Sequence, residues 1–224
     1  MVAGAIKQLS GWENDILFSS GVSNSGETDS NLFRKEIDLV LQHLTKLSQA
    51  GTFVYFSTTS IFDPNRKMSH YIRHKLFIES LIKASNKKFL IVRLPNLVGS
   101  SLNPHTLTNY FAESIRLEKP INLNEAAIRH LIDVADLSYI LNDIKERYGK
   151  NKLTVNVETD RPLSALEILH FLEDVIKKKA HVNLSRQNPV IKNIRENTDI
   201  VALNYLLSVR EDYHKQMMKK YYSS

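Results

Sequence analysis

The sequence contains no cysteine, only seven glycines and no long hydrophobic run. The absence of cysteine excludes disulfides, thiolate metal ligands and cysteine nucleophiles, and it suits a reducing compartment. No segment reaches the roughly 18 consecutive apolar residues of a transmembrane helix. The N-terminus also lacks the basic region ahead of an apolar one that a signal peptide requires. We therefore expect a cytoplasmic protein with no membrane segment.

The overall composition is that of a globular protein. The 224 residues are 42% hydrophobic and 24% charged, which excludes wholesale disorder. Thirty basic and 24 acidic residues give a net charge of +6. The densest basic runs, Lys177 to Lys179 and Lys219 to Lys220, are typical of solvated helix ends. Because no RGG-like tract or basic–aromatic interleaving is present, we expect no nucleic-acid partner.

Strand-like and helix-like segments alternate in the N-terminal half. Short apolar segments at 15–21, 52–57 and 89–93 have the composition of buried strands. Between them, one helix is predicted after the capping residues Thr28 to Ser30, and a second over residues 69–84. This alternation with short connections predicts a doubly wound α/β fold with a parallel sheet.

In such a sheet, ligands bind beyond the carboxyl ends of the strands. The strands predicted here end in mostly small or polar residues, at 19–21, 57–59 and 94–96. We therefore expect the functional site at this edge of the sheet.

The C-terminal half is less regular. Ser164 and Glu167 have the spacing of a capping box that opens a helix. The other predicted elements are helices at 107–116 and from about 136, strands at 131–134 and 153–157, a loop over 182–198, and helices over 199–207 and the tail to Tyr222.

Tyr71 and Lys75 are the first candidates for chemistry. Residues four apart share one face of a helix, and an ammonium one turn from a phenol favours the phenolate and lowers its pKa. The pair could therefore act as an acid/base on a hydroxyl or carbonyl group. Tyr148 and Lys152 have the same spacing, but Gly149 makes that copy a surface turn.

No metal site is predicted. The eight histidines form no cluster with ligand spacing. His70 and His74 share a helix face without a third ligand, and we expect both to lie on the surface.

Four segments, in order, resemble the extended short-chain dehydrogenase/reductase superfamily, which holds the NAD-dependent epimerases and dehydratases. The first is Phe53-Val54-Tyr55-Phe56-Ser57-Thr58-Thr59-Ser60-Ile61-Phe62, similar to the family's fifth strand and active-site turn. The others are the Tyr71/Lys75 pair, Arg93-Leu94-Pro95-Asn96-Leu97-Val98-Gly99, and Arg129-His130-Leu131-Ile132-Asp133-Val134-Ala135-Asp136, with His130 and Asp133 as departures.

The resemblance implies a role for each matching residue. Thr58, Tyr71 and Lys75 become the catalytic set, with Tyr71 as acid/base and Lys75 also on the nicotinamide ribose. Ser19, Ser20, Gly21 and Pro95 become cofactor-binding residues, and Asn96 and Arg129 contact the diphosphate of a nucleotide sugar. The implied domains are a Rossmann-like core over residues 1–100 and a small, mixed substrate-binding region over 101–224, of which 130–157 returns to the core.

Two departures from the family matter. Thr59 and Ser60 follow Thr58 where family dehydratases carry an Asp-Glu pair, which disfavours a 4,6-dehydratase. The family's opening strand and G-x-x-G-x-x-G turn are also missing, although that turn binds the cofactor pyrophosphate. Residues 2–9 could be the first strand or the helix that follows the turn, and their scarcity of β-branched residues favours the helix. We expect cofactor binding to be weak or lost, and the 16–18 strand to have one unpaired edge.

The resemblance implies an NAD- or NADP-dependent epimerase or ketoreductase that acts on a nucleotide-linked sugar, as in polysaccharide biosynthesis. The alternative is a truncated, non-catalytic relative that binds a sugar nucleotide or a protein partner. The residues leave open the sugar, the choice of NAD or NADP, the direction of reaction and the oligomer, a homodimer among the alternatives.

Overall fold

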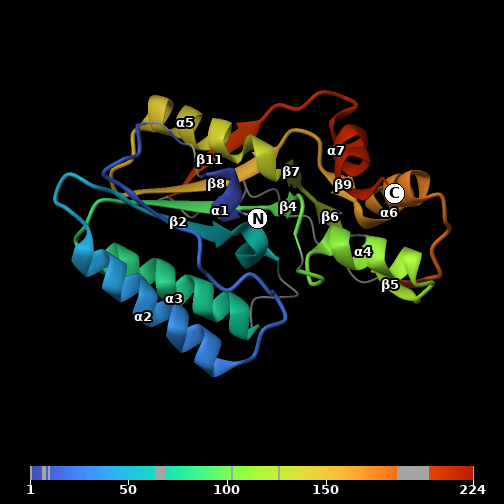
Figure 1. Cartoon of the computed structure of the whole chain (residues 1–224), viewed down its shortest axis with the longest axis horizontal. Helices are drawn as coiled ribbons and strands as arrows, with labels where there is room; N and C mark the ends of the chain where they lie inside the picture. The colour runs from blue at the N-terminus through green and yellow to red at the C-terminus, as the bar shows by residue number, and fades with distance from the viewer. Residues whose placement is uncertain are drawn as a thin grey trace.

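The computed structural model describes residues 2–6, 9, 11–63, 69–101, 103–125, 127–185 and 202–223. A five-stranded parallel sheet with the order β1-β2-β3-β8-β11 forms its centre (Figure 1). The strands are β1 (Ile16–Phe18), β2 (Phe53–Thr58), β3 (Phe89–Leu94), β8 (Leu153–Thr159) and β11 (Ala202–Leu207). This mixed α/β architecture with a parallel central sheet is Rossmann-like, as predicted.

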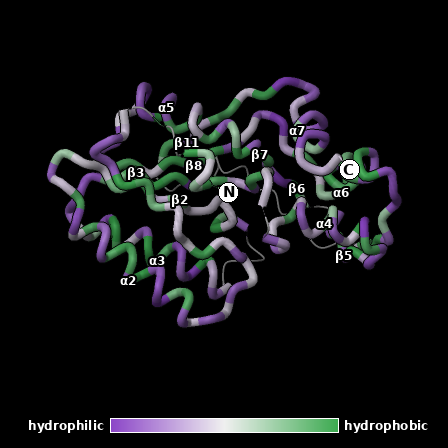
Figure 2. Tube along the Cα trace, in the orientation of Figure 1, coloured by the Kyte–Doolittle hydropathy of each residue, from purple (hydrophilic) through white to green (hydrophobic). Residues whose placement is uncertain are grey.

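Helices cover both faces of the sheet. α2 (Ser30–Lys46) and α3 (His70–Ala84) lie together on one face, and α5 (Leu137–Tyr148) lies on the other (Figure 1). Alternate residues of a strand pack against the helices on opposite faces, because successive side chains point to opposite sides of the sheet. Phe53 and Tyr55 pack with α2 and α3, whereas Val54 packs with α5. Figure 2 shows the same division, with hydrophobic residues along the central strands and hydrophilic ones on the outer helix surfaces.

Side-chain caps mark the starts of three helices, and two of these caps lie at residues predicted for that role. The Asp29 side chain accepts a hydrogen bond from the Asn31 amide at the start of α2, and Ser69 accepts one from Ile72 in α3. At α6 (Ala165–Ile176), Ser164 and Glu167 form both halves of the capping box. Each cap satisfies an amide that has no partner inside the helix, which is why these residues mark the helix boundaries.

The N-terminal segment is helical, which confirms the helix over the strand. α1 (Val2–Ala5) packs with α5, and Trp12 is buried in the same hydrophobic cluster. Lys7 and Gln8, within the segment considered, lie outside the described residues. β1 ends the sheet, and its second edge has no strand partner in the part of the chain that the structure describes.

A third hydrophobic cluster lies apart from the two on the faces of the central sheet, at the right of Figure 1. It is built mainly by α4 (Leu107–Arg116), α6 and α7 (Tyr213–Tyr222). The remaining elements are β4 (Asn96–Val98), β5 (Ile121–Asn124), β6 (Ile128–Arg129), β7 (Leu131–Asp133), β9 (Leu163–Ser164), β10 (Val182–Ser185), and the 3-10 turns η1 (Thr59–Phe62) and η2 (Val134–Asp136).

Two secondary-structure predictions for the C-terminal half are wrong. The predicted helix over 199–207 is instead strand β11 from Ala202, paired with β8 over six residues. The predicted loop over 182–198 begins with strand β10, which pairs with β5. A short apolar run has no decisive periodicity, so the available partner strand selects its structure. Residues 186–201 lie outside the described part of the chain.

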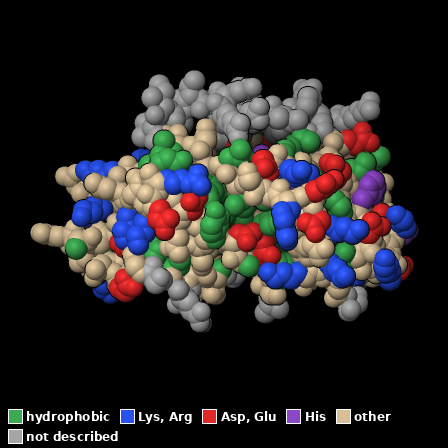
Figure 3. Space-filling view, turned by 90° about the horizontal axis from the view of Figure 1, so that it is seen from above, with side chains coloured by type: hydrophobic (Ala, Val, Ile, Leu, Met, Phe, Trp, Pro, Cys, Tyr) green, Lys and Arg blue, Asp and Glu red, His purple; other side chains and the backbone are tan. Residues whose placement is uncertain are grey.

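None of the helices within the described ranges is long and apolar enough to span a bilayer. Basic and acidic side chains are interspersed over the face seen in Figure 3, so the excess of positive charge is spread out on this face.

Candidate functional site

A cavity of about 800 Å³ lies beyond the carboxyl ends of β1, β2 and β3. Its size falls within the range of about 300–1,000 Å³ typical of small-molecule sites. Its walls come from these strand ends, from α1 and α3, and from the segments around β4, β5 and β6. The predicted site residues that line it are Ser19, Gly21, Thr58, Tyr71, Lys75, Pro95, Asn96 and Arg129. Ser20 is exposed and does not line it.

Thr58, Tyr71 and Lys75 reach the cavity from adjacent elements. Thr58 is the last residue of β2, and its hydroxyl oxygen accepts a 3.0 Å hydrogen bond from the Ser60 amide. Tyr71 lies in the first turn of α3, and Lys75 lies one turn later. All three side chains are buried, and the Lys75 nitrogen lies 5.8 Å from the centre of the Tyr71 ring. The structure therefore brings the predicted catalytic set to one cavity.

The Lys75 ammonium is held by a buried carboxylate. Its nitrogen donates to Glu36 Oε1 at 3.1 Å and to the Tyr55 hydroxyl at 3.0 Å. Burial lowers the pKa of Lys75, whereas the charge and hydrogen bond of Glu36 raise it. The net effect is a lowered pKa of Lys75. Burial favours the neutral amine, and the Glu36 carboxylate opposes burial by stabilising the charged ammonium.

Glu36 keeps its negative charge in this environment. Burial alone would raise the pKa of its carboxyl group, but the His74 hydrogen bond and the Lys75 charge outweigh that effect. With further hydrogen bonds from Val22 and Tyr55, the pKa of Glu36 is lowered from 4.5 to about 2. Burial and the neighbouring carboxylate raise the pKa of Tyr55 well above its ordinary value of 10.0.

His74 corrects one of the sequence predictions. It was expected on the surface, but it is buried, stacks on Phe33 at 4.5 Å between ring centres, and contacts Glu36 Oε2 at 2.9 Å. His70 is exposed, as expected. Among the residues that the structure describes, no group of three or more His, Asp or Glu side chains could hold a metal ion.

Asn96 and Arg129 lie in the part of the wall built by the short strands β4 and β6. The Asn96 side-chain amide donates to the His130 carbonyl at 3.4 Å. Arg129 Nη1 donates to the Ile128 carbonyl at 2.9 Å, and Nη2 lies 3.7 Å from Asp63 Oδ2. Both polar side chains therefore lie in the same cavity as Thr58, Tyr71 and Lys75.

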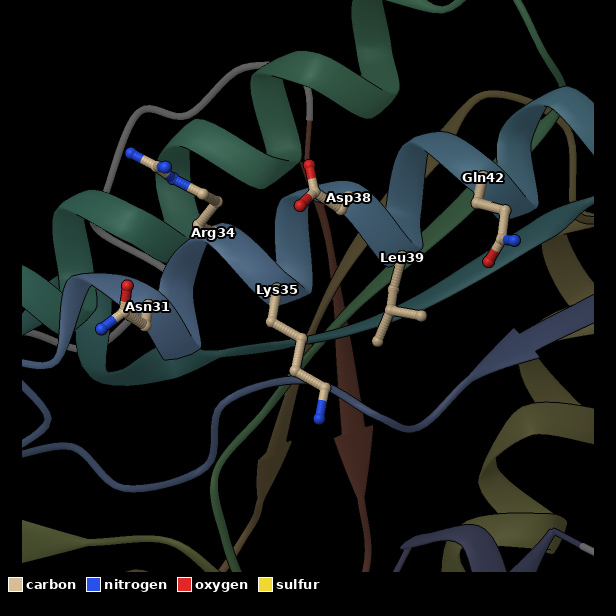
Figure 4. A pocket seen from close by; sticks show the side chains of 6 residues that line it. All are labelled: Asn31, Arg34, Lys35, Asp38, Leu39 and Gln42. Carbon is tan, nitrogen blue, oxygen red and sulfur yellow. The ribbon is translucent and has the colours of Figure 1, made fainter.

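A second hollow, on the surface of α2, has a different character (Figure 4). Lys35 and Leu39 leave the helix on one side in this view, and Arg34 and Asp38 leave it on the other. Its lining is Asn31, Arg34, Lys35, Asp38, Leu39 and Gln42. Mixed charges along an exposed helix are typical of a solvated surface, so we place the functional site in the larger cavity.

Comparison with known proteins identifies the family. The family model described as "NAD dependent epimerase/dehydratase family" matches residues 16–154, which include β1, β2, α3 and the cavity residues they carry. The chain belongs to this family. A search of curated proteins found no match.

Solved structures show the same fold at low sequence identity. UDP-glucuronic acid 4-epimerase from Bacillus cereus, in complex with NAD, is 14% identical with a TM-score of 0.67, over 99% of this chain and 76% of that one. UDP-glucose 4-epimerase from Thermus thermophilus, also with NAD, is 17% identical with a TM-score of 0.58, over 85% and 70%. RMD from Pseudomonas aeruginosa, complexed with NADPH, is 15% identical with a TM-score of 0.62, over 98% and 83%.

For this family member, sequence reasoning missed the buried charges next to the site. Glu36 occupies the apolar stripe of α2 that includes Phe33 and Val40, and a carboxylate on such a stripe was the available signal. Arg93 belongs to one of the matching motifs, and it also forms a buried ion pair with Glu79 of α3, which the motif does not indicate. A charge at a core position requires a partner, and only the folded chain shows which one.

Proposed function

We propose that the chain is an NAD- or NADP-dependent epimerase or ketoreductase that acts on a nucleotide-linked sugar. The observation that carries the proposal is that Thr58, Tyr71 and Lys75 share one ligand-sized cavity with Asn96 and Arg129. Family membership supports it, and so does the fold shared with two NAD-bound UDP-sugar epimerases and with NADPH-bound RMD.

The residues present fit the nicotinamide end of such a cofactor. Ser19, Gly21 and Pro95 line the cavity where β1 and β3 end, and the Lys75 ammonium, which lies next to Gly21, would bind the ribose hydroxyls. At the pyrophosphate end, the sequence offers no glycine-rich turn. We therefore keep the prediction that the cofactor binds weakly to this chain.

The bound nicotinamide would supply the hydride acceptor and donor. Tyr71, as the phenolate, takes the proton from a sugar hydroxyl while the carbon that bears it is oxidised, and returns that proton on reduction. Lys75 favours the phenolate through its positive charge. Thr58 shares the same sugar oxygen, and Arg129 and Asn96 hold the diphosphate in the adjoining part of the cavity.

The alternative is a relative that binds a sugar nucleotide or a protein without turnover. It is favoured for these 224 residues by themselves, which contain no glycine-rich turn to supply several charge-assisted hydrogen bonds to the cofactor. The two functions differ in whether Tyr71 is needed for a reaction or only for binding.

The experiment combines a binding screen with one matched pair of variants. The full chain is tested by calorimetry with NAD⁺, NADP⁺, UDP-glucose and UDP-glucuronic acid, and turnover is followed for the sugars that bind. Tyr71→Phe is expected to lower turnover by about 10²–10⁴-fold without loss of sugar-nucleotide binding, because it removes the acid/base alone. Arg129→Ala is expected to weaken that binding.

Tyr148→Phe is the matched control, since Tyr148 belongs to the other Tyr-x-x-x-Lys pair and is exposed at the end of α5. Wild-type turnover in Tyr71→Phe would exclude the acid/base role. Sugar-nucleotide binding with neither cofactor binding nor turnover would favour the non-catalytic alternative.

A further inference from the structure

Glu36 is a buried charge that contacts Lys75 directly and that the proposed mechanism does not use. Only 2% of its surface is exposed. Its carboxylate accepts four hydrogen bonds. Oε1 accepts from the Tyr55 hydroxyl at 2.7 Å and from Lys75 at 3.1 Å, and Oε2 contacts His74 at 2.9 Å and accepts from the Val22 amide at 2.6 Å.

These partners come from three different parts of the fold. Tyr55 lies in β2, His74 and Lys75 in α3, and Val22 in the segment after β1. A buried carboxylate is stable only when such partners replace water, so the arrangement holds these elements in fixed relation. Lys75 lines the cavity, whereas Glu36 does not. Any effect of Glu36 on the site must therefore act through its neighbours.

Gly21 provides the space for this contact. A Cβ atom at position 21 would lie 2.8 Å from Glu36 Oε1 and 2.9 Å from Lys75 Nζ. Distances below 3.0 Å require these side-chain ends to move, so even alanine would displace the two charged groups. Gly21 thus matters because it has no side chain, immediately before Val22, whose amide donates to the same carboxylate.

We infer that Glu36 is a positioning residue, which holds the Lys75 ammonium at the cavity wall one helical turn from Tyr71, in a space that Gly21 leaves open. The inference rests on the proposed function, in which the Lys75 charge favours the phenolate of Tyr71. Beyond that function, we infer that a carboxylate outside the cavity maintains the Lys75 charge.

Glu79 offers a matched comparison for a purely structural role. It is also 2% exposed, lies on the same helix as Lys75 and pairs with Arg93 at 2.6 Å. Within the described part of the chain, no hydrogen bond or ion pair joins it to Lys75, and it does not line the cavity. Glu79→Gln should lower the stability of the core. It should lower the Lys75 midpoint only slightly, because the charge of Glu79 is the smallest of the effects that raise the pKa of Lys75.

The test is the protonation of Lys75 in the full chain, followed by NMR of lysine labelled with ¹³C at Cε. The signal is assigned by its loss in Lys75→Arg. Glu36→Gln keeps the size of the side chain and removes its charge, which leaves burial to act on the ammonium. We expect the Lys75 titration midpoint to fall by about one pH unit or more in Glu36→Gln, and by less than half as much in Glu79→Gln.

A second pair of variants decides the question if Glu36→Gln does not fold. Gly21→Ala changes no charge but pushes Glu36 and Lys75 apart, so the Lys75 midpoint should fall. Gly26→Ala is its control, because a Cβ there meets only an ordinary 3.5 Å contact with Asn24. An unchanged midpoint in the folded Glu36 variant, or in Gly21→Ala, overturns the inference, and so does an equal fall in Glu79→Gln.

The titration requires neither cofactor nor substrate. If the chain binds no NAD⁺ or NADP⁺ and turns over no sugar nucleotide, the proposed enzymatic function fails. The positioning of Lys75 by Glu36 is then still decided by the titration midpoints.

Discussion

Arg93 of β3 and Glu79 of α3 form a buried ion pair whose contribution to stability can be measured. Two hydrogen bonds join them, from Arg93 Nε at 2.9 Å and from Nη2 at 2.6 Å, and each residue is only 2% exposed. The Ser57 hydroxyl donates to the same carboxylate at 2.6 Å, and Lys83 approaches it at 3.9 Å.

Arg93→Met removes the cation and leaves the carboxylate buried. Breaking one side of a buried pair costs about 3–5 kcal/mol. Because Ser57 and Lys83 still contact Glu79, we expect the low end, a loss of about 3 kcal/mol in the free energy of unfolding. In the double variant Arg93→Met/Glu79→Met, both charges are gone. We expect it to be more stable than Arg93→Met and within about 2 kcal/mol of the wild type.

Urea unfolding provides the assay. Trp12 is the single tryptophan and is 3% exposed, so its fluorescence reports the loss of the core. The comparison requires that the free energy of unfolding falls with urea concentration at the same slope in all variants, because a changed slope indicates a changed unfolded or native state. A loss of less than about 1 kcal/mol in the free energy of unfolding of Arg93→Met would refute this expectation. So would a loss in the double variant equal to the sum of the losses in Arg93→Met and Glu79→Met.

Two other predictions concern a glycine substitution and stability in acid. Gly51→Ala should destabilise the protein by about 1–3 kcal/mol, because its Cβ would lie 2.2 Å from the Asn14 carbonyl oxygen. Gly4→Ala is the control, because a Cβ there has nothing within 4 Å, and equal melting temperatures for the two variants would contradict the prediction. Glu36 has a pKa lowered from 4.5 to about 2, so its contribution to stability is present above pH 4.5 and is lost as the pH falls through 2. Urea unfolding between pH 6 and pH 2 should therefore depend less on pH in Glu36→Gln, and an identical dependence would refute the assignment.

Local patterns were sufficient for the alternation of strands and helices. Val40 and Leu44 repeat at the spacing that buries one face of α2, and Asp29 and Ser69 cap the helices that follow them. These signals depend on neighbours within a few residues, so the sequence contains all of their causes. The family resemblance, now confirmed, rested on motifs of the same local kind. The roles of Tyr71 and the other site residues, and the division at residue 100, stay predictions.

The tertiary structure determined which segments form strands, and which charged side chains are buried, where the partners are distant in the sequence. Residues 202–207 form a strand because β8 has a free edge beside them, although a short apolar run also suits a helix. His74 and Glu36 are 38 residues apart and each looks like a surface group by itself. Their burial is favourable only because Tyr55, Lys75 and the Val22 amide meet them in the fold. The sequence by itself thus determined the alternating strands and helices of the N-terminal half. Strand β11 and the free energy of a buried charge depend on partners that only folding brings together.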